Sequence, residues 1–163
     1  SGPTALKKPA YVETVDVVSA QDMFEAVTSR APDMDIIIKA AAVADYRPAT
    51  LADNKIKKKD GDMSIPLERT RDILGALGAG KRAGQFLCGF SMETENMVEN
   101  SRKKLVKKNL DMIVVNNLRT EGAGFGTDTN VVTIITREGE YDLPKASKHE
   151  VSKKILDRIT QMM

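Results

Sequence analysis

The chain has 163 residues, of which 41% are hydrophobic and 29% charged, a composition that suits one globular domain and argues against global disorder. The formal net charge is only +2, so a basic surface for nucleic acid would have to be local. One cysteine, Cys88, excludes a disulfide framework, and one histidine, His149, argues against a Ser-His-Asp triad or a multi-histidine metal site. The sequence contains no membrane-spanning apolar run and no signal-peptide pattern, so we expect a cytoplasmic protein.

The first third of the chain alternates short apolar runs with a helical segment. Residues 15–18 are a strand candidate. Ser19, followed three residues later by Asp22, resembles a capping box and predicts the start of a helix that Pro32 ends. The isoleucine-rich run at residues 35–42 then predicts a buried strand, because β-branched residues favour strands and the run is short.

The middle of the chain begins with a long irregular stretch and then returns to alternation. Residues 43–62 predict a loop, which at this length is usually functional or mobile in a compact domain. The elements expected after it are a weak strand at 64–67, a helix at 71–77, a strand at 85–90, a helix at 93–109 and a strand at 111–115. We interpret the glycines at positions 78 and 80 as the end of the helix that begins at residue 71.

The C-terminal third predicts a loop, a hairpin and a helix. Residues 122–126 are glycine-rich and predict a loop. Two strands, at 131–136 and 140–143, flank a turn and predict an antiparallel hairpin. Ser147 and Glu150 form a second capping-box pattern, and the apolar residues that follow at four-residue spacing predict a helix to about residue 159.

These elements predict an α/β fold. Its three layers are a mostly parallel sheet and helices on both faces, with a C-terminal antiparallel hairpin. Ligands of such sheets bind beyond the carboxyl ends of the strands, which fall here at residues 40–45, 90–93 and 116–117.

Three alanines and an aspartate follow the isoleucine-rich run. The small side chains at 40–42 leave the backbone accessible to a planar ring, and Asp45 could hold a divalent cation or a sugar hydroxyl. The same residues are also typical of tight packing against a helix followed by a turn. The residues alone leave both interpretations open.

Two lysine clusters could carry anion chemistry. Residues 55–59 contain four lysines and could clamp phosphates, or they could form a solvated charge run or a nucleic-acid patch. Lys104 and Lys108 lie four residues apart on a predicted helix and so share a face, where their like charges repel. Either an anion lies between them, or the face is solvated. The spacing of the glycines at 122–126 does not match a dinucleotide fingerprint.

Several motifs in the same order resemble one family. Ala-Ala-Val-Ala-Asp-Tyr-Arg-Pro at residues 41–48, followed by Lys-Ile-Lys-Lys at 55–58, resembles bacterial phosphopantothenate–cysteine ligase, the synthetase half of the bifunctional coenzyme A biosynthesis flavoprotein. Supporting matches include Gly-Phe at 89–90, Glu-Thr at 93–94, Lys104 to Asp111, and Gly-Phe-Gly at 124–126 with Asp128 and Asn130.

The resemblance implies a Rossmann-like fold that binds CTP and Mg²⁺. Members activate the carboxylate of 4'-phosphopantothenate as an acyl cytidylate, which the amine of cysteine then attacks. Asp45 would belong to the nucleotide and metal site, and Lys55 would neutralise the phosphates and the intermediate; both are the expected catalytic residues. The other implied nucleotide-binding residues are Lys39, Ala40, Ala41, Lys58, Arg71, Asp72, Ile73, Leu74, Phe90, Lys104 and Lys108.

Relative to that family, residues 1–163 match the ligase domain without its first strand and glycine-rich phosphate-binding segment, so we expect weak or no turnover from this chain alone. The flavin mononucleotide would belong only to the decarboxylase half of a bifunctional parent. We expect a homodimer, with residues 131–143 and the glycine-rich loop as candidate contacts, and no nucleic-acid or membrane partner. The competing hypotheses are a basic-patch nucleic-acid-binding domain and an NAD-type oxidoreductase domain, which here lacks its fingerprint.

Overall fold

The computed structural model describes residues 1–58, 61–92, 96–117 and 126–163. The chain forms two compact units. The first, which we call the ribbon unit, comprises Ser1–Ser29 and Ala42–Ile73, and the second, the sheet unit, comprises Arg30–Ala41 and Leu74–Met163. The predicted glycine-rich loop at 122–126 falls outside the described residues except at Gly126, as do Lys59 and the first three residues of the helix predicted at 93–109.

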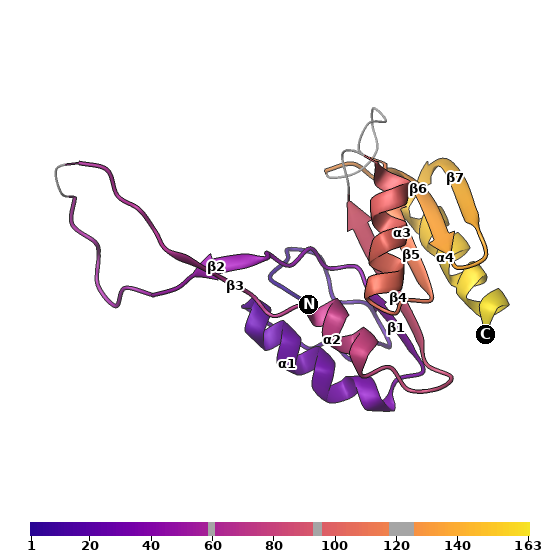
Figure 1. The fold of residues 1–163 in the computed structure, drawn as a ribbon, viewed down its shortest axis with the longest axis horizontal. Coiled ribbons are helices and arrows are strands. Elements are labelled where there is room, and N and C mark those ends of the chain that lie inside the picture. The colour runs from indigo at the N-terminus through magenta and orange to yellow at the C-terminus, as the bar shows by residue number, and fades with distance from the viewer. Residues whose placement is uncertain (59–60, 93–95, 118–125) are drawn as a thin grey trace. The chain divides into compact units, whose positions relative to one another are not determined.

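A five-stranded sheet forms the centre of the sheet unit (Figure 1). The strands lie in the order β1, β4, β5, β6, β7; the first two neighbouring pairs are parallel and the last two are antiparallel. Four of the five described strands therefore run in one direction and β6 opposes them, which confirms the mostly parallel sheet. The strand bounds are Ile36–Lys39, Phe86–Met92, Met112–Asn116, Thr129–Thr136 and Glu140–Ser147.

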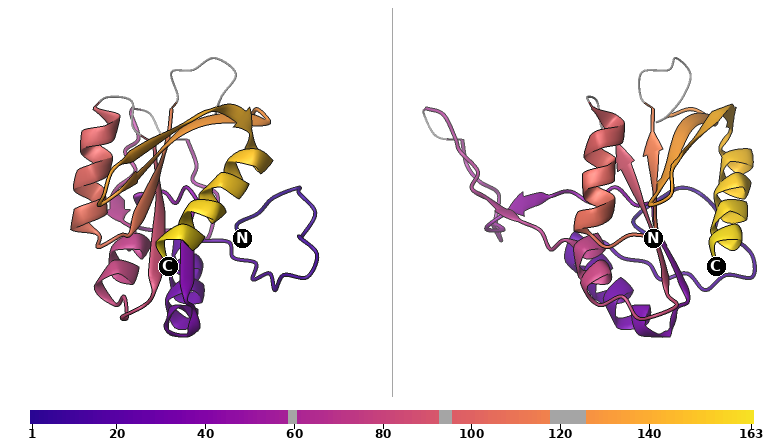
Figure 2. Two further views of the ribbon diagram at one scale, coloured as in Figure 1. Left: turned by 90° about the vertical axis from the view of Figure 1, so that its right-hand side faces the viewer. Right: turned by 45° about the vertical axis from the view of Figure 1, so that its right-hand side comes forward.

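Helices cover both faces of this sheet, as predicted (Figure 2). Side chains alternate between the two faces along a strand, so consecutive residues within β4, and likewise within β5, point to opposite faces of the sheet. One face packs Cys88, Met112 and Val114 against the buried stripe of α4 (Lys148–Met162). The other face carries the residues between these, and α3 (Met97–Lys107), which contacts β4, β5 and β6, lies on that side.

The C-terminal hairpin and helix form as the sequence predicts. In β6 and β7, Val132 pairs with Leu143 and Ile135 with Glu140. Ser147 caps α4 with a complete capping box: its hydroxyl accepts from the Glu150 N–H, and its own N–H donates to the Glu150 carboxylate. The buried residues of α4 are those expected from the spacing, Val151, Ile155 and Ile159.

The strand β1 is shorter and more exposed than the run at 35–42 predicts. It ends at Lys39, and within the described sheet it pairs only with β4, from Ile36↔Phe86 to Lys39↔Gly89. Ile36 and Ile38 are each 39% exposed, because a strand with one neighbour cannot bury both faces as fully as a central strand. The strand is therefore present, but the expectation that it is buried is wrong.

The helix α2 (Ile73–Ala79) extends past the glycine that was expected to end it. Gly78 is buried inside the helix, and a Cβ built there would lie 1.9 Å from the backbone oxygen of Lys108. This glycine thus permits close backbone approach rather than capping the helix. Gly80 is the residue after the helix end, and its N–H donates to the Ala76 carbonyl.

The ribbon unit contains α1 (Ala20–Arg30), of which all but the last residue belongs to this unit, and a two-stranded ribbon. The predicted capping box at the start of α1 is present: the Asp22 N–H donates to the Ser19 hydroxyl, and the Ser19 N–H donates to the Asp22 carboxylate. The ribbon pairs β2 (Tyr46–Pro48) with β3 (Leu67–Arg69). The sequence missed β2 and placed the second strand at 64–67, because three-residue strands carry too little periodicity to be recognised.

The strand predicted at residues 15–18 is not formed. The Val17 N–H donates to the Ser1 carbonyl, and the Val15 carbonyl accepts from the amino group of Ser1. The polar backbone groups of this segment therefore bond within the N-terminal segment, and the strand-like composition does not lead to a ladder.

Candidate functional site

The carboxyl ends of β1, β4 and β5 meet at one edge of the sheet. The register pairs Lys39 with Gly89 and Met92 with Asn116, so β4 and β5 end side by side and β1 ends three residues earlier. This is the edge at which parallel α/β sheets bind ligands. It is therefore the first place to look for the predicted residues of the sheet unit.

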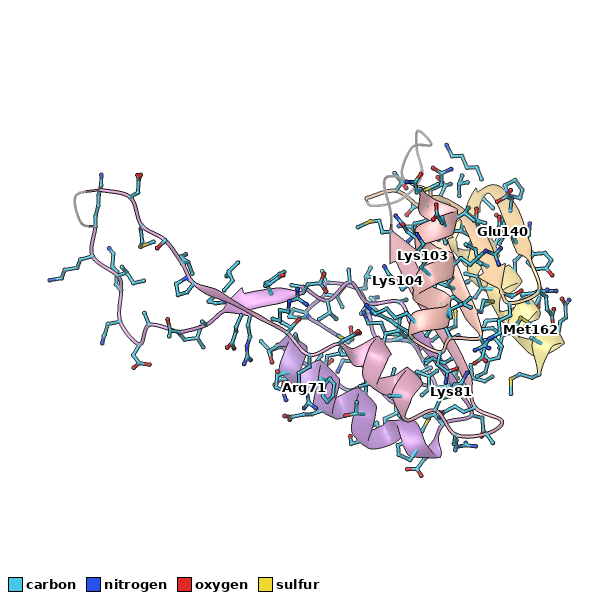
Figure 3. The ribbon with its side chains drawn as sticks, viewed as in Figure 1. Arg71, Lys81, Lys103, Lys104, Glu140 and Met162 are labelled. Atoms are coloured by element: carbon cyan, nitrogen blue, oxygen red, sulfur yellow. The ribbon has the colours of Figure 1, made fainter. Side chains whose placement is uncertain are left out.

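Lys104 reaches this edge from α3. Its Nζ donates to the Ser91 hydroxyl at 3.3 Å, and Ser91 is buried near the end of β4. The neighbouring Lys103 lies differently: it is 70% exposed and forms an ion pair with Glu99 one turn earlier, at 2.7 Å. The two adjacent lysines, labelled in Figure 3, therefore have distinct surroundings.

Lys108 lies one turn further along and forms the C-cap of α3. Its backbone N–H donates to the carbonyl of Lys104, and its own carbonyl lies against Gly78 of α2. The side chains of Lys104 and Lys108 are both half-buried, so the face that they share is not fully solvated.

Lys39 and the alanines after it lie where β1 ends. The Lys39 ammonium folds back and donates to the carbonyl of Ala41 at 2.7 Å. Ala40 and Ala41 are exposed and belong to no strand. Accessible main-chain groups thus follow this strand, as the sequence predicts.

The apolar residues of the predicted site belong to packed regions. Phe90 of β4 is partly buried and packs against the core face that α4 covers. Leu74 is buried, and a Cβ built on Gly89 would lie 2.8 Å from its Cδ2, so this leucine packs closely on β4. Ile73, the first residue of α2, is also buried. Their main role in this structure is therefore packing.

Three further predicted residues lie in or beside the ribbon of the ribbon unit. The Asp45 carbonyl accepts from the Thr70 N–H at 2.9 Å, and its carboxylate side chain is exposed. The guanidinium of Arg71 lies over the Phe24 ring of α1, 3.5 Å from its centroid (Figure 3). Asp72 follows it and is exposed.

Lys55 and Lys58 lie on the loop that joins β2 to β3, and both are exposed. Figure 1 shows the described parts of this loop running out from the ribbon. The prediction of a long irregular segment at 43–62 is correct for residues 43–45, 49–58 and 61–62, and β2 interrupts it.

The donor chemistry around Asp45 fits a cation that also uses substrate oxygens. Among the described residues, no group of three or more histidine, cysteine, aspartate or glutamate side chains could hold a metal ion. Mg²⁺ commonly uses only one or two carboxylates together with water and substrate phosphates. A lone exposed carboxylate such as Asp45 is compatible with that mode of binding.

Two polar contacts at the strand ends were not identified from the sequence. Ser91 holds Lys104, and the Asn130 amide of β6 donates to the Asn116 side chain of β5 at 2.8 Å. A serine at the end of an otherwise apolar run was the available signal for Ser91. Its partner lies 13 residues away, on another element, and only the fold identifies it.

The single cysteine and the single histidine have surroundings that do not suggest catalysis. Cys88 is fully buried in β4; burial, followed by the nearby charge of Asp111, raises the pKa of its thiol to about 12. The thiol is therefore not a nucleophile at neutral pH. His149 is exposed in the first turn of α4. In the part of the chain that the structure covers, no helix has both the length and the apolar character needed to cross a bilayer.

Comparison with known proteins identifies the family. The model of the family described as the DNA/pantothenate metabolism flavoprotein C-terminal domain matches residues 1–163. The chain belongs to this family, and the resemblance drawn from the motifs is confirmed.

The relatives place the chain within larger proteins. It is 49% identical over 164 residues to the coenzyme A biosynthesis bifunctional protein CoaBC of Bacillus subtilis, covering 99% of this chain and 40% of that protein. It is 42% identical, over 99% of this chain and 46% of the relative, to a cysteine/cysteine sulfinic acid decarboxylase from an unknown prokaryotic organism. The chain thus spans less than half the length of these curated relatives.

A solved structure agrees with the fold. The crystal structure of the C-terminal domain of a CoaBC protein superposes with a TM-score of 0.80 at 46% identity, covering 99% of this chain and 73% of that chain. The α/β architecture is therefore shared with a close relative.

Proposed function

We propose that the chain serves in the ligation of 4'-phosphopantothenate with L-cysteine, with CTP as the activating nucleotide. Its membership of the family and its identity to a coenzyme A biosynthesis bifunctional protein support this role. The observation that carries the proposal is the position of Lys104, whose ammonium group lies beside Ser91 at the ligand-binding edge of the sheet.

The proposed reaction has two steps. A carboxylate oxygen of 4'-phosphopantothenate attacks the α-phosphorus of CTP, a P–O bond forms, and pyrophosphate leaves. The amine of cysteine then attacks the carbonyl carbon of the acyl cytidylate; a C–N bond forms, the bond to the cytidylate oxygen breaks, and CMP and one proton leave. The second step requires orientation more than a nucleophilic side chain, which agrees with the inert thiol of Cys88.

Fixed cations are the matching protein groups, because the first step builds charge on phosphoryl oxygens. In the sheet unit, we assign phosphate contacts to Lys104 and Lys108, and base contacts to main-chain groups of residues 39–41. In the ribbon unit, we assign phosphate contacts to Lys55 and Lys58. Asp45 would hold Mg²⁺, which when bound neutralises charge on phosphate oxygens.

Product analysis tests the reaction directly. Because only weak turnover is expected from this chain alone, the protein is incubated for a long time with CTP, Mg²⁺, 4'-phosphopantothenate and cysteine, and we expect slow release of pyrophosphate and slow formation of 4'-phosphopantothenoylcysteine, detected by mass. ATP in place of CTP should give much less product, and an oligonucleotide should not compete. Release of carbon dioxide from cysteine without amide formation would instead favour a decarboxylase role. The same preparation tests the proposed homodimer by sedimentation.

Lys104 and Lys103 form a matched pair for testing the assignment of the site. Loss of one preorganised charge-stabilising group typically costs on the order of 10²–10³ in rate, so Lys104→Ala should lower kcat/KM by that factor. Lys103→Ala removes the same charge from the next residue and should leave kcat/KM within about twofold, since it breaks only an exposed ion pair. Equal losses in both variants would contradict the assignment.

A further inference from the structure

One cavity in the ribbon unit differs from two others in its charge. A cavity of about 560 Å³ within residues 1–18 is lined by Lys7, by Lys8 and by Asp16, which pairs with Lys8. One of about 350 Å³ in the sheet unit is lined by Lys81, by its partner Asp111 and by Arg82, which pairs with Asp35. The third, about 260 Å³, has arginines and no carboxylate among its lining residues. We call it the arginine pocket; it is lined by Ser19, Ala20, Gln21, Ala44, Tyr46, Arg47, Arg69, Thr70 and Arg71.

Hydrogen bonds at the base of the ribbon hold the walls of the pocket. Tyr46 pairs with Arg69 across the ribbon. The Thr70 hydroxyl donates to the Ala44 carbonyl at 2.6 Å, and the Thr70 N–H donates to the Asp45 carbonyl at 2.9 Å. These two bonds from Thr70 join the residue after β3 to the two residues before β2. The walls of the pocket therefore do not depend on the loop at the other end of the ribbon.

Arg69 is the last residue of β3, Arg71 follows two residues later, and both line the arginine pocket. The Arg69 guanidinium lies 5.8 Å from the centroid of Tyr46, and that of Arg71 lies 3.5 Å from the centroid of Phe24. Stacking uses the face of a guanidinium, whereas its N–H groups point outward in the plane and can still donate hydrogen bonds. The rings carry no net charge, so these contacts leave the positive charges of the two arginines in place.

Arg47 is the third cation, and its charge is already compensated: its Nε donates to Glu68 at 2.7 Å. At the start of α1, the Asp22 carboxylate already accepts a hydrogen bond from the Ser19 N–H. The uncompensated charge of the pocket therefore belongs to Arg69 and Arg71, which repel each other unless an anion lies between them.

We propose that the arginine pocket binds the phosphate monoester of a small-molecule ligand through Arg69 and Arg71. The planar fork of arginine matches phosphate oxygens in bidentate geometry, and the two positive charges favour an anion over an uncharged apolar ligand. The identity of the ligand rests on the proposed function, in which 4'-phosphopantothenate is the substrate that ends in a monoester. Arg69 is then a residue that selects the phosphorylated acid.

Calorimetric titration with 4'-phosphopantothenate and with pantothenate, its counterpart without phosphate, tests the proposal. In the absence of CTP and cysteine, we expect the protein to prefer the phosphorylated ligand. Arg69→Ala should weaken binding of 4'-phosphopantothenate by about 10- to 100-fold, as loss of a charged hydrogen-bond donor typically does, and should leave binding of pantothenate unchanged. Arg69→Lys, which keeps the charge without the fork, should lose less.

Arg102→Ala is the matched control, because Arg102 forms its ion pair with Glu140 in the sheet unit and should not affect either ligand. Thermal unfolding of each variant establishes that the protein is folded, and Arg69→Lys replaces Arg69→Ala if the latter is not. Equal binding of the two ligands, or an unchanged affinity for 4'-phosphopantothenate in the folded Arg69 variant, overturns the proposal. Because no turnover is measured, absence of ligation would disprove the proposed reaction while leaving this result intact.

Discussion

Lysines of the sheet unit and of the ribbon unit have contrasting surroundings. Lys104 is half-buried and held by Ser91, whereas Lys55 and Lys58 are exposed on the loop between β2 and β3. A cation that its neighbours already hold loses little conformational entropy when an anion arrives, and an exposed lysine must lose its rotamer freedom at that moment. The two units would therefore contribute charge in different ways. The lysine of the sheet unit is preorganised, whereas the lysines of the loop would be ordered by the ligand.

The same contrast applies to stability. Backbone and side chains of the sheet unit meet at close distances around Gly78 and Gly89, and changes there disturb packing. The exposed lysines of the loop have no such constraint. Substitutions at these two glycines should therefore affect folding, whereas those of the exposed loop lysines should affect only catalysis.

The largest expected effect is on catalysis, in the loop. Lys55→Ala should lower kcat/KM by about 10²–10³, because a charge that stabilises the phosphoryl oxygens is lost. The free energy of unfolding should change by no more than about 0.5 kcal/mol, since the side chain is exposed. Lys57→Ala, in the same loop, is the control and should retain activity. Equal losses of kcat/KM in both variants would show that the loop acts only as a general basic patch.

A backbone contact of the sheet unit should give the next largest effect. Gly78→Ala places a Cβ 1.9 Å from the Lys108 carbonyl oxygen, and overpacking of this kind destabilises by about 3 kcal/mol. Gly80→Ala, just past the end of the same helix, meets only the Ala76 oxygen at 3.6 Å and should cost less than about 1 kcal/mol. Urea denaturation measures both. A similar stability of the two variants would show that α2 and α3 can separate at this contact.

The smallest effect concerns the cap of α4 and depends on pH. Hydrogen bonds from the Ser147 side chain and backbone hold the pKa of Glu150 below its ordinary value. These hydrogen bonds therefore stabilise the folded protein fully at pH values above the pKa that Glu150 has in the unfolded chain. The stabilisation is lost as the pH falls through the lower pKa that Glu150 has in the folded protein. Ser147→Ala should destabilise by about 1 kcal/mol at neutral pH, as loss of an N-cap does.

Urea denaturation between pH 7 and pH 3 checks this expectation, with Ser152→Ala as the control, because the Ser152 hydroxyl bonds the His149 carbonyl and caps no helix. The difference between wild type and Ser147→Ala should shrink toward acid. A difference that stays constant would show that the Glu150 carboxylate contributes nothing to the cap.

Local patterns were reliable where they were long or carried a specific capping signal. The α4 stripe, both capping boxes and the hairpin of β6 and β7 all appear as predicted. The patterns failed where tertiary pairing decided the outcome, as in the unformed strand at 15–18, whose backbone bonds to Ser1. They also failed for the short β2, which exists through its pairing with β3.

The candidate site followed the same division. The motif residues Asp45, Lys55 and Lys104 could be named from sequence, because the chemistry of an anion site restricts the residue types. The hydrogen bond from Lys104 to Ser91, and the place of Arg69 beside Tyr46, could not, because each partner lies on a different element.

The sequence by itself determined the α/β class, the capped helices and the types of side chain available for chemistry, since these depend on periodicity and on neighbours within one turn. Only the tertiary structure decided that Gly78 is a contact rather than a cap, that β1 has one described neighbour, and that arginines line a pocket without a carboxylate. The physical reason is that packing distances and charge neighbourhoods arise between residues far apart in the chain, which local propensities do not encode.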